Sequence, residues 1–228
     1  MISCKKSDSP ITKVTPVDLD SITANYYEQY LKLYPLDATA QGDERYNDQL
    51  PINIDKDIIS GEITFYNSVQ NQLKKVDYKS LSDQDKTVYD VLDYTLKDKI
   101  ERYAYHPEYI PFTQFSGLPL DFPLLGSGQG NQPFKTEKDY SDWLKRTENF
   151  PAWMDAAIEN FREGITNQYV LPKKLVVKMV TQMNAEEITT SDFSKNIFYG
   201  PINNFPKNFT AAQREKFTKE FKTMITKI

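Results

Sequence analysis

The sequence predicts a mainly α-helical fold built as a multi-helix array, and three observations support this prediction. Apolar residues recur at a spacing of three or four in most of the chain, capping signals begin several of these segments, and neither an alternating strand pattern nor an internal repeat occurs. With 228 residues, of which 39% are hydrophobic and 26% charged, the chain is long enough to bury a core without disulfides.

The N-terminal half is predicted to hold three helices. The first covers residues 18–34, where a proline ends the pattern, and a turn-rich connector follows over residues 35–51. The second covers residues 55–76. Ser82, with Asp85 three residues later, approximates a capping box and begins the third helix. The predicted buried stripe of this helix is Val88, Val91, Leu92, Leu96, Ile100 and Tyr103.

Residues 105–135 interrupt the helical pattern. Five prolines lie in this segment and exclude a continuous helix, whereas its aromatic residues supply large apolar groups. The sequence therefore predicts a long Pro- and aromatic-rich loop that packs against the helices. Loops of this length tend to be functional or disordered.

Helices are predicted to resume at Thr136, where Asp139 completes a capping box, and Pro151 either kinks this helix or begins a new one. A further helix follows Pro172, and another capping box begins the last helix at Thr210. These segments complete the predicted array.

The last predicted helix has an apolar stripe that runs to the final residue, with no glycine, asparagine or proline to end it. We therefore expect residues 17–228 to be the helical N-terminal region of a larger domain, truncated at its C-terminal end. The stripe consists of Phe217, Phe221, Met224, Ile225 and Ile228.

The segment around Arg162, Glu163 and Gly164 invites a catalytic interpretation, because a charged pair lies beside a flexible backbone. At about 100° per residue, however, Gly164 falls within the apolar stripe of its helix, while Glu163 points away from it. A glycine on the buried face indicates close backbone packing. We therefore interpret Arg162, Gly164 and Pro172 as a structural corner between two helices.

The balance of charged and metal-binding residues excludes several classes of function. The 28 basic and 32 acidic residues give a formal net charge of −4, which provides no electrostatic reason to expect nucleic acid as a partner. No segment approaches the roughly 20 apolar residues of a membrane-spanning helix.

The chain has one histidine, His106, and one cysteine, Cys4, which cannot build the usual zinc site. No catalytic or metal-binding residue is therefore predicted within this chain. We interpret His106 as a surface or helix-capping residue.

The N-terminal segment MISC resembles the end of a bacterial lipoprotein signal, in which Cys4 would carry the lipid. The charged start and apolar run of a complete signal are absent, so the sequence would begin late. We predict that residues 1–16 are a signal remnant and flexible tether, and that the protein lies in the bacterial cell envelope. The alternative is a frayed terminus with an incidental cysteine.

Five segments, in this order, resemble the bacterial family known as domain of unknown function 885. The resemblance extends over most of residues 25–185. The segments are YPLDATAQGD at 34–43, RYNDQLP at 45–51, QFSG at 114–117, FKTEKDYSDWLKR at 134–146 and FREGITNQYVLP at 161–172.

This resemblance implies a metallopeptidase-like α-helical fold, and its members are often lipoproteins. It also implies an H-E-x-x-H helix in the C-terminal half of a chain more than twice this length. In that motif two histidines bind zinc and the glutamate activates a bound water. The present sequence contains no such motif. The resemblance therefore assigns zinc only to the full-length protein and assigns no catalytic residue here.

Two functional hypotheses follow. In the first, the chain is the non-catalytic scaffold and cleft wall of a membrane-anchored zinc-dependent hydrolase that acts on peptides. Its partners would be the missing C-terminal half of its own chain, the membrane through the lipid, and a peptide substrate. Gln114, Phe115 and Phe122 would then be candidate cleft-lining residues.

In the second hypothesis, the chain is a self-sufficient lipid-anchored helical module that binds peptide or glycan through its 15 Tyr, 13 Phe and two Trp.

Overall fold

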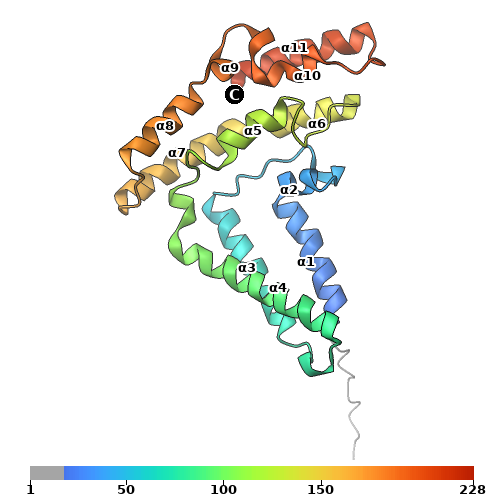
Figure 1. Cartoon of the computed structure of the whole chain (residues 1–228), viewed down its shortest axis with the longest axis vertical. Helices are drawn as coiled ribbons and strands as arrows, with labels where there is room; N and C mark the ends of the chain where they lie inside the picture. Colours follow the sequence, from blue (N-terminus) through green and yellow to red (C-terminus); the bar gives the residue numbers. More distant parts are fainter. Residues whose placement is uncertain (1–17) are drawn as a thin grey trace, which may run out of the picture.

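The computed structural model describes residues 18–228, and within this range it contains helices and no strands, which confirms the predicted fold class (Figure 1). The predicted tether and Cys4 lie outside the described residues. The α-helices are α1 (Leu19–Leu33), α2 (Pro35–Ala40), α3 (Lys56–Leu73), α4 (Asp83–Arg102), α5 (Leu118–Gly126), α6 (Glu137–Thr147), α7 (Phe150–Thr166), α8 (Lys173–Met183), α9 (Glu186–Thr189), α10 (Gly200–Asn203) and α11 (Ala211–Lys227). Short 3-10 helices join them, among them η1 (Glu44–Tyr46), η3 (Tyr103–Tyr105), η4 (Pro107–Tyr109) and η6 (Ile197–Tyr199).

Side-chain caps begin several helices at the predicted positions. The hydroxyl of Ser82 accepts the backbone N–H of Asp85 at the start of α4, and reciprocal capping boxes begin α6 at Thr136 and α11 at Thr210. Each cap satisfies backbone N–H groups that have no partner within the helix. Pro151 lies in the first turn of α7, so it begins a new helix and does not kink α6.

Two segments that were predicted to be irregular contain helices. Pro35 is the first residue of α2, a position where the missing N–H of proline costs nothing. Within the predicted loop, residues 118–126 form α5, with Pro119 in its first turn and Pro123 inside it. The prediction of an irregular chain was therefore wrong at both places.

The buried stripe of α4 is narrower than predicted. Leu92 and Leu96 are buried, but Val88 and Val91 are 40% and 60% exposed. The reason is that α4 packs against α1 and α3 along one face only.

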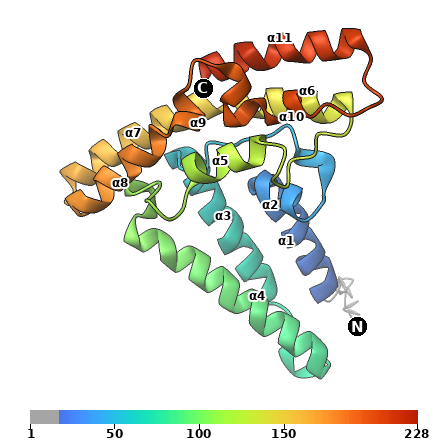
Figure 2. The ribbon, with the colours of Figure 1, turned by 45° about the horizontal axis from the view of Figure 1, so that its top comes forward.

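Apart from the short α2, which packs against α1 and η1, the α-helices form two groups. The three-helix unit consists of α1, α3 and α4, which pack around a core that includes Tyr66 and Leu96. The upper layer consists of α5 to α11, and much of it packs around a second core that includes Phe122 and Trp143. In Figure 1 the three-helix unit lies below the upper layer, and the same separation is visible after the rotation in Figure 2.

The apolar stripe of α11 is covered within the chain. Phe217 and Phe221 are fully buried and Met224 is 6% exposed, because α11 packs against α6, α10 and η6 (Figure 2). Ile225 and Ile228 are only partly buried. None of the helices in residues 18–228 combines the length and apolar character needed to cross a bilayer.

Candidate functional site

A cavity of about 570 Å³ lies between the three-helix unit and the upper layer. This volume falls within the roughly 300–1,000 Å³ that is typical of small-molecule sites. On the side of the three-helix unit, the cavity is lined by the α1–α2 junction, α3 and the end of α4. The segment that leads from α4 through η3 and η4 to α5, together with Trp153 of α7, completes the lining.

A buried carboxylate, Glu62 of α3, lines this cavity and is only 2% exposed. The hydroxyls of Tyr66 and Tyr103 donate to it at 2.5 and 2.7 Å, and the hydroxyl of Tyr34 donates as well. A buried carboxylate is costly unless it is hydrogen-bonded. The three donors therefore satisfy Glu62. Tyr66 lies on the same helix as Glu62, whereas Tyr34 at the end of α1 and Tyr103 at the end of α4 connect those two helices to α3.

The tyrosine cluster around Glu62 also surrounds a cation. The Lys99 Nζ of α4 lies 5.0 Å from the ring centroid of Tyr34 and 5.5 Å from that of Tyr66, within the range of cation–π attraction. Burial lowers the pKa of Lys99, whereas the charge of Glu62 acts to raise it. Burial, and after it the hydrogen bond to Glu62, raises the pKa of Tyr66 and Tyr103, so both phenols remain donors at neutral pH.

The single histidine of the chain lines the same cavity. His106 Nδ1 lies 2.9 Å from Oε1 of Glu108, and the imidazole stacks on the ring of Tyr109 with centroids 4.8 Å apart. The backbone of His106 is left-handed, with φ 51°, a conformation that is uncommon for residues other than glycine. His106 is the C-cap of η3, and its side chain is 46% exposed.

The three predicted cleft-lining side chains lie elsewhere. Phe122 is fully buried, because α5 turns it into the core against Trp143 and Phe150. Gln114 is buried beside α8, and Phe115 is 86% exposed on the surface outside the cavity. Neighbouring residues of the same segment, Thr113, Ser116, Gly117 and Leu118, line the cavity instead.

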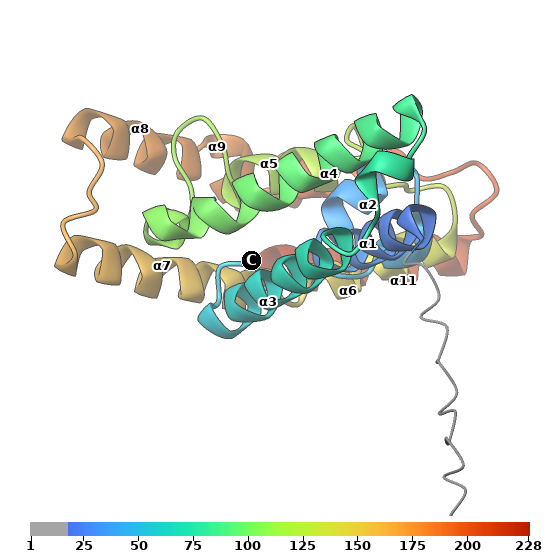
Figure 3. The same cartoon turned by 90° about the horizontal axis from the view of Figure 1, so that it is seen from below.

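The predicted corner lies where α7 ends and α8 begins, around residues 167–172 (Figure 3). Gly164 is buried, and a Cβ atom there would lie 2.6 Å from the backbone oxygen of Tyr109. Arg162 is exposed and pairs with Glu159 at 2.5 Å. Pro172 is the N-cap of α8, one residue before the helix begins.

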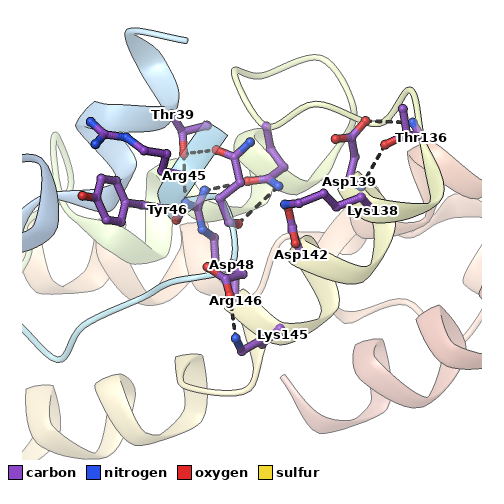
Figure 4. Close-up of polar contacts among 12 residues, drawn as sticks. Thr39, Arg45, Tyr46, Asp48, Thr136, Lys138, Asp139, Asp142, Lys145 and Arg146 are labelled. Carbon is purple, nitrogen blue, oxygen red and sulfur yellow. Dashed lines mark hydrogen bonds and ion pairs between the residues drawn. The ribbon is translucent and has the colours of Figure 1, made fainter. Parts of the chain in front are cut away.

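A buried arginine connects the α2–η1 segment to α6 (Figure 4). Arg146 is fully buried, and burial lowers the pKa of its guanidinium to about 10, which leaves it charged at neutral pH. The guanidinium donates to Thr39 Oγ1 at 2.9 Å, Tyr46 O at 2.6 Å, Gln49 O at 3.0 Å and Gln132 Oε1 at 2.5 Å.

No local sequence signal distinguishes this arginine from an exposed one. Arg146 closes the segment at 134–146 that resembles the family, but its helical position alone does not reveal that backbone oxygens from residues 46–49 would surround it. Its neighbour Lys145 shows the contrast, since it forms a surface ion pair with Asp48 at 2.5 Å (Figure 4).

Polar and aromatic side chains are gathered at the cavity. Residues 18–228 contain no group of at least three His, Cys, Asp or Glu side chains that lie close enough together to hold a metal ion. The cavity brings together carboxylates, phenols and one imidazole beside aromatic rings. Such a lining can bind a polar ligand that carries an apolar group.

Comparison with known proteins places the chain in a family. No curated protein and no solved structure matches it. The family described as "Bacterial protein of unknown function (DUF885)" matches residues 35–228, which include nearly the whole cavity lining and the Arg146 network. The chain therefore belongs to this bacterial family, as the five segments predicted.

Proposed function

We propose that residues 18–228 form the scaffold and one wall of the peptide-binding cleft of a helical, membrane-anchored hydrolase, without supplying its catalytic residues. The observation that supports this proposal most is the cavity between the two helical groups. Exposed aromatic rings such as Tyr105 would pack against peptide side chains, and the acidic groups would accept hydrogen bonds from a peptide.

The zinc-dependent part of the proposal rests on the family resemblance alone. The described residues do not fit a zinc site, because they hold no suitable group of ligands. We therefore assign no catalytic step to them.

The test is whether the protein translated from the complete gene hydrolyses pentapeptides in a reaction that the zinc chelator 1,10-phenanthroline blocks. Hydrolysis that the chelator leaves unchanged would exclude zinc chemistry.

Tyr105→Ala is expected to weaken peptide binding about fivefold, because an exposed aromatic contact contributes about 1 kcal/mol. Tyr105 lines the cavity and is 68% exposed, so its removal should leave the melting temperature unchanged. Binding would be measured by isothermal titration calorimetry of the 228-residue chain with synthetic apolar, acidic and basic pentapeptides.

Tyr94→Ala is the matched control, since Tyr94 of α4 is 73% exposed and lies outside the cavity. It should leave the affinity unchanged. If both variants weaken binding equally, or if none of the pentapeptides binds, the cavity is not the peptide site.

A self-sufficient binding module is the second candidate, and one observation favours it. Phe217 and Phe221 of α11 are buried against other parts of this chain, as expected of a module that folds by itself. The same calorimetry with chitotetraose and maltopentaose separates the two candidates. Binding of an oligosaccharide but of no pentapeptide would favour the module.

The membrane anchor and the envelope location are part of the proposal, and they depend on Cys4. In cells that express the complete gene, Cys4→Ser is expected to move the protein from the membrane fraction to the soluble fraction. The thioether that carries the lipid requires this sulfur. Immunoblots of the two fractions provide the measurement, and an unchanged distribution would show that Cys4 is incidental.

A further inference from the structure

The cavity lining carries an excess of negative charge. Four acidic side chains of residues 18–228 line it, namely Asp37, Glu62, Glu108 and Asp121, together with one arginine, Arg102. Lys99 lies outside the lining and its charge interacts with Glu62 and Asp37, but the acidic groups still outnumber these two basic groups. Walls of one sign concentrate ligands of the opposite sign. This lining therefore favours a cationic group over an anionic one.

The pairing of His106 with Glu108 determines what the imidazole can offer. A carboxylate accepts hydrogen bonds but does not donate them, so the Nδ1 that lies 2.9 Å from Glu108 carries the proton. In the neutral imidazole, Nε2 then holds a lone pair. In the described part of the chain Nε2 has no hydrogen-bond partner, and the side chain is 46% exposed at the cavity.

The fold holds this pair in place. His106 has a left-handed backbone between η3 and η4. Its ring stacks on Tyr109 and meets Tyr169 edge-on, and the two tyrosine rings also contact each other. Glu108 is largely buried, and its second oxygen, Oε2, has no partner within the described residues. A strained residue that is held at a cavity by its neighbours is a common feature of functional sites.

We propose that His106 binds the ammonium group of a ligand in this cavity, with Nε2 as the acceptor and Glu108 as the positioning residue that fixes the tautomer. The ligand class is an amine that carries an apolar or aromatic group, such as the free N-terminus of a peptide. This inference rests on the proposed function in that both use the same cavity, but it adds a requirement for a cationic group.

The sole histidine makes the test direct, because an untagged chain gives a single set of imidazole resonances. Long-range ¹H–¹⁵N spectra should show the tautomer protonated at Nδ1. Addition of L-phenylalaninamide should shift the Nε2 resonance in a saturable way. N-acetyl-L-phenylalaninamide, which lacks the ammonium group, should bind at least tenfold more weakly.

Two variants test the assigned roles. His106→Asn removes Nε2 but keeps a residue that tolerates the left-handed backbone, and it should weaken binding at least tenfold. Glu108→Gln should weaken binding by a similar factor and shift the tautomer population toward protonation at Nε2. Glu159→Gln is the control, because it removes the same charge from an exposed site outside the cavity, and it should change the affinity less than twofold.

The outcomes separate this inference from the proposed function. Equal binding of the acetylated probe, an unshifted Nε2 resonance, or no binding of the amine overturns the inference. If pentapeptides bind at the cavity regardless of Glu108, the proposed function stands and the inference fails. If the amine binds as described but no pentapeptide does, the inference stands and the proposed function fails.

Discussion

Arg146→Ala is expected to lower the free energy of unfolding by about 3–5 kcal/mol, because several buried oxygens lose their charged donor at once and each buried polar group left without a partner costs about 1–3 kcal/mol. The guanidinium is fully buried and supplies the donors for a side-chain oxygen of Thr39 and for backbone oxygens of Tyr46 and Gln49. Without it these oxygens would be buried with fewer donors, and a cavity would remain. Urea denaturation followed by circular dichroism measures the change.

Two further variants show whether the geometry of the guanidinium is the cause. Arg146→Lys keeps the positive charge, but one ammonium cannot reach acceptors on several sides, so most of the loss should remain. Lys145→Ala removes a neighbouring cation whose ion pair with Asp48 is on the surface, and it should cost less than about 1 kcal/mol. Similar costs for the Arg146 and Lys145 variants would contradict a stabilising hydrogen-bond network around the Arg146 guanidinium.

The sequence located most helices because their signals are local. The hydroxyls of Ser82, Thr136 and Thr210 each accept the backbone N–H of the residue three positions later, so the capping signal can be read from four consecutive residues. Proline is ambiguous in this respect, since it can end one helix or begin the next. At Pro35 it does both, because α1 ends two residues before it and α2 begins at it.

Burial was harder to predict because it depends on neighbours far apart in the sequence. Val91 has the helical spacing of a core residue, yet it is 60% exposed because no element of residues 18–228 covers that face of α4. Phe122 was predicted as a cleft residue because its segment was expected to be a loop. Once residues 118–126 form a helix, the ring is turned inward.

Most of the candidate site could not be predicted from the sequence, because it too depends on contacts between residues far apart in the chain. Glu62 resembles any solvated glutamate on a helix, and only the fold brings Tyr34 and Tyr103 to it. His106 stands out in the sequence as the only histidine. Its pairing with Glu108, two residues away, depends on a left-handed backbone at His106, and no local sequence pattern predicts that conformation.

Gly164→Leu is expected to lower the free energy of unfolding by about 3 kcal/mol, whereas Glu163→Gln should cost less than about 1 kcal/mol. At Gly164 even a Cβ atom would lie 2.6 Å from the backbone oxygen of Tyr109 and 3.2 Å from that of Tyr169, and backbone cannot move aside as a flexible side chain can. Glu163 pairs with Lys56, whose side chain is 68% exposed. It also accepts a long hydrogen bond of 3.5 Å from the hydroxyl of Tyr109, which the amide oxygen of glutamine can accept as well, so little is lost without the charge. Thermal and urea denaturation of both variants provides the comparison, and equal costs would contradict the close packing at Gly164.

The same contact links the corner to the cavity. The backbone that approaches Gly164 belongs to η4, which contains Glu108 and directly follows His106. A side chain at Gly164 would have to displace η4, and this displacement would separate the imidazole from the carboxylate that orients it. We therefore expect Gly164→Leu, under conditions where it is still folded, to weaken L-phenylalaninamide binding at least tenfold and to alter the His106 tautomer. Glu163→Gln should change neither, and a folded Gly164→Leu variant with unchanged binding would show that the corner does not position the pair.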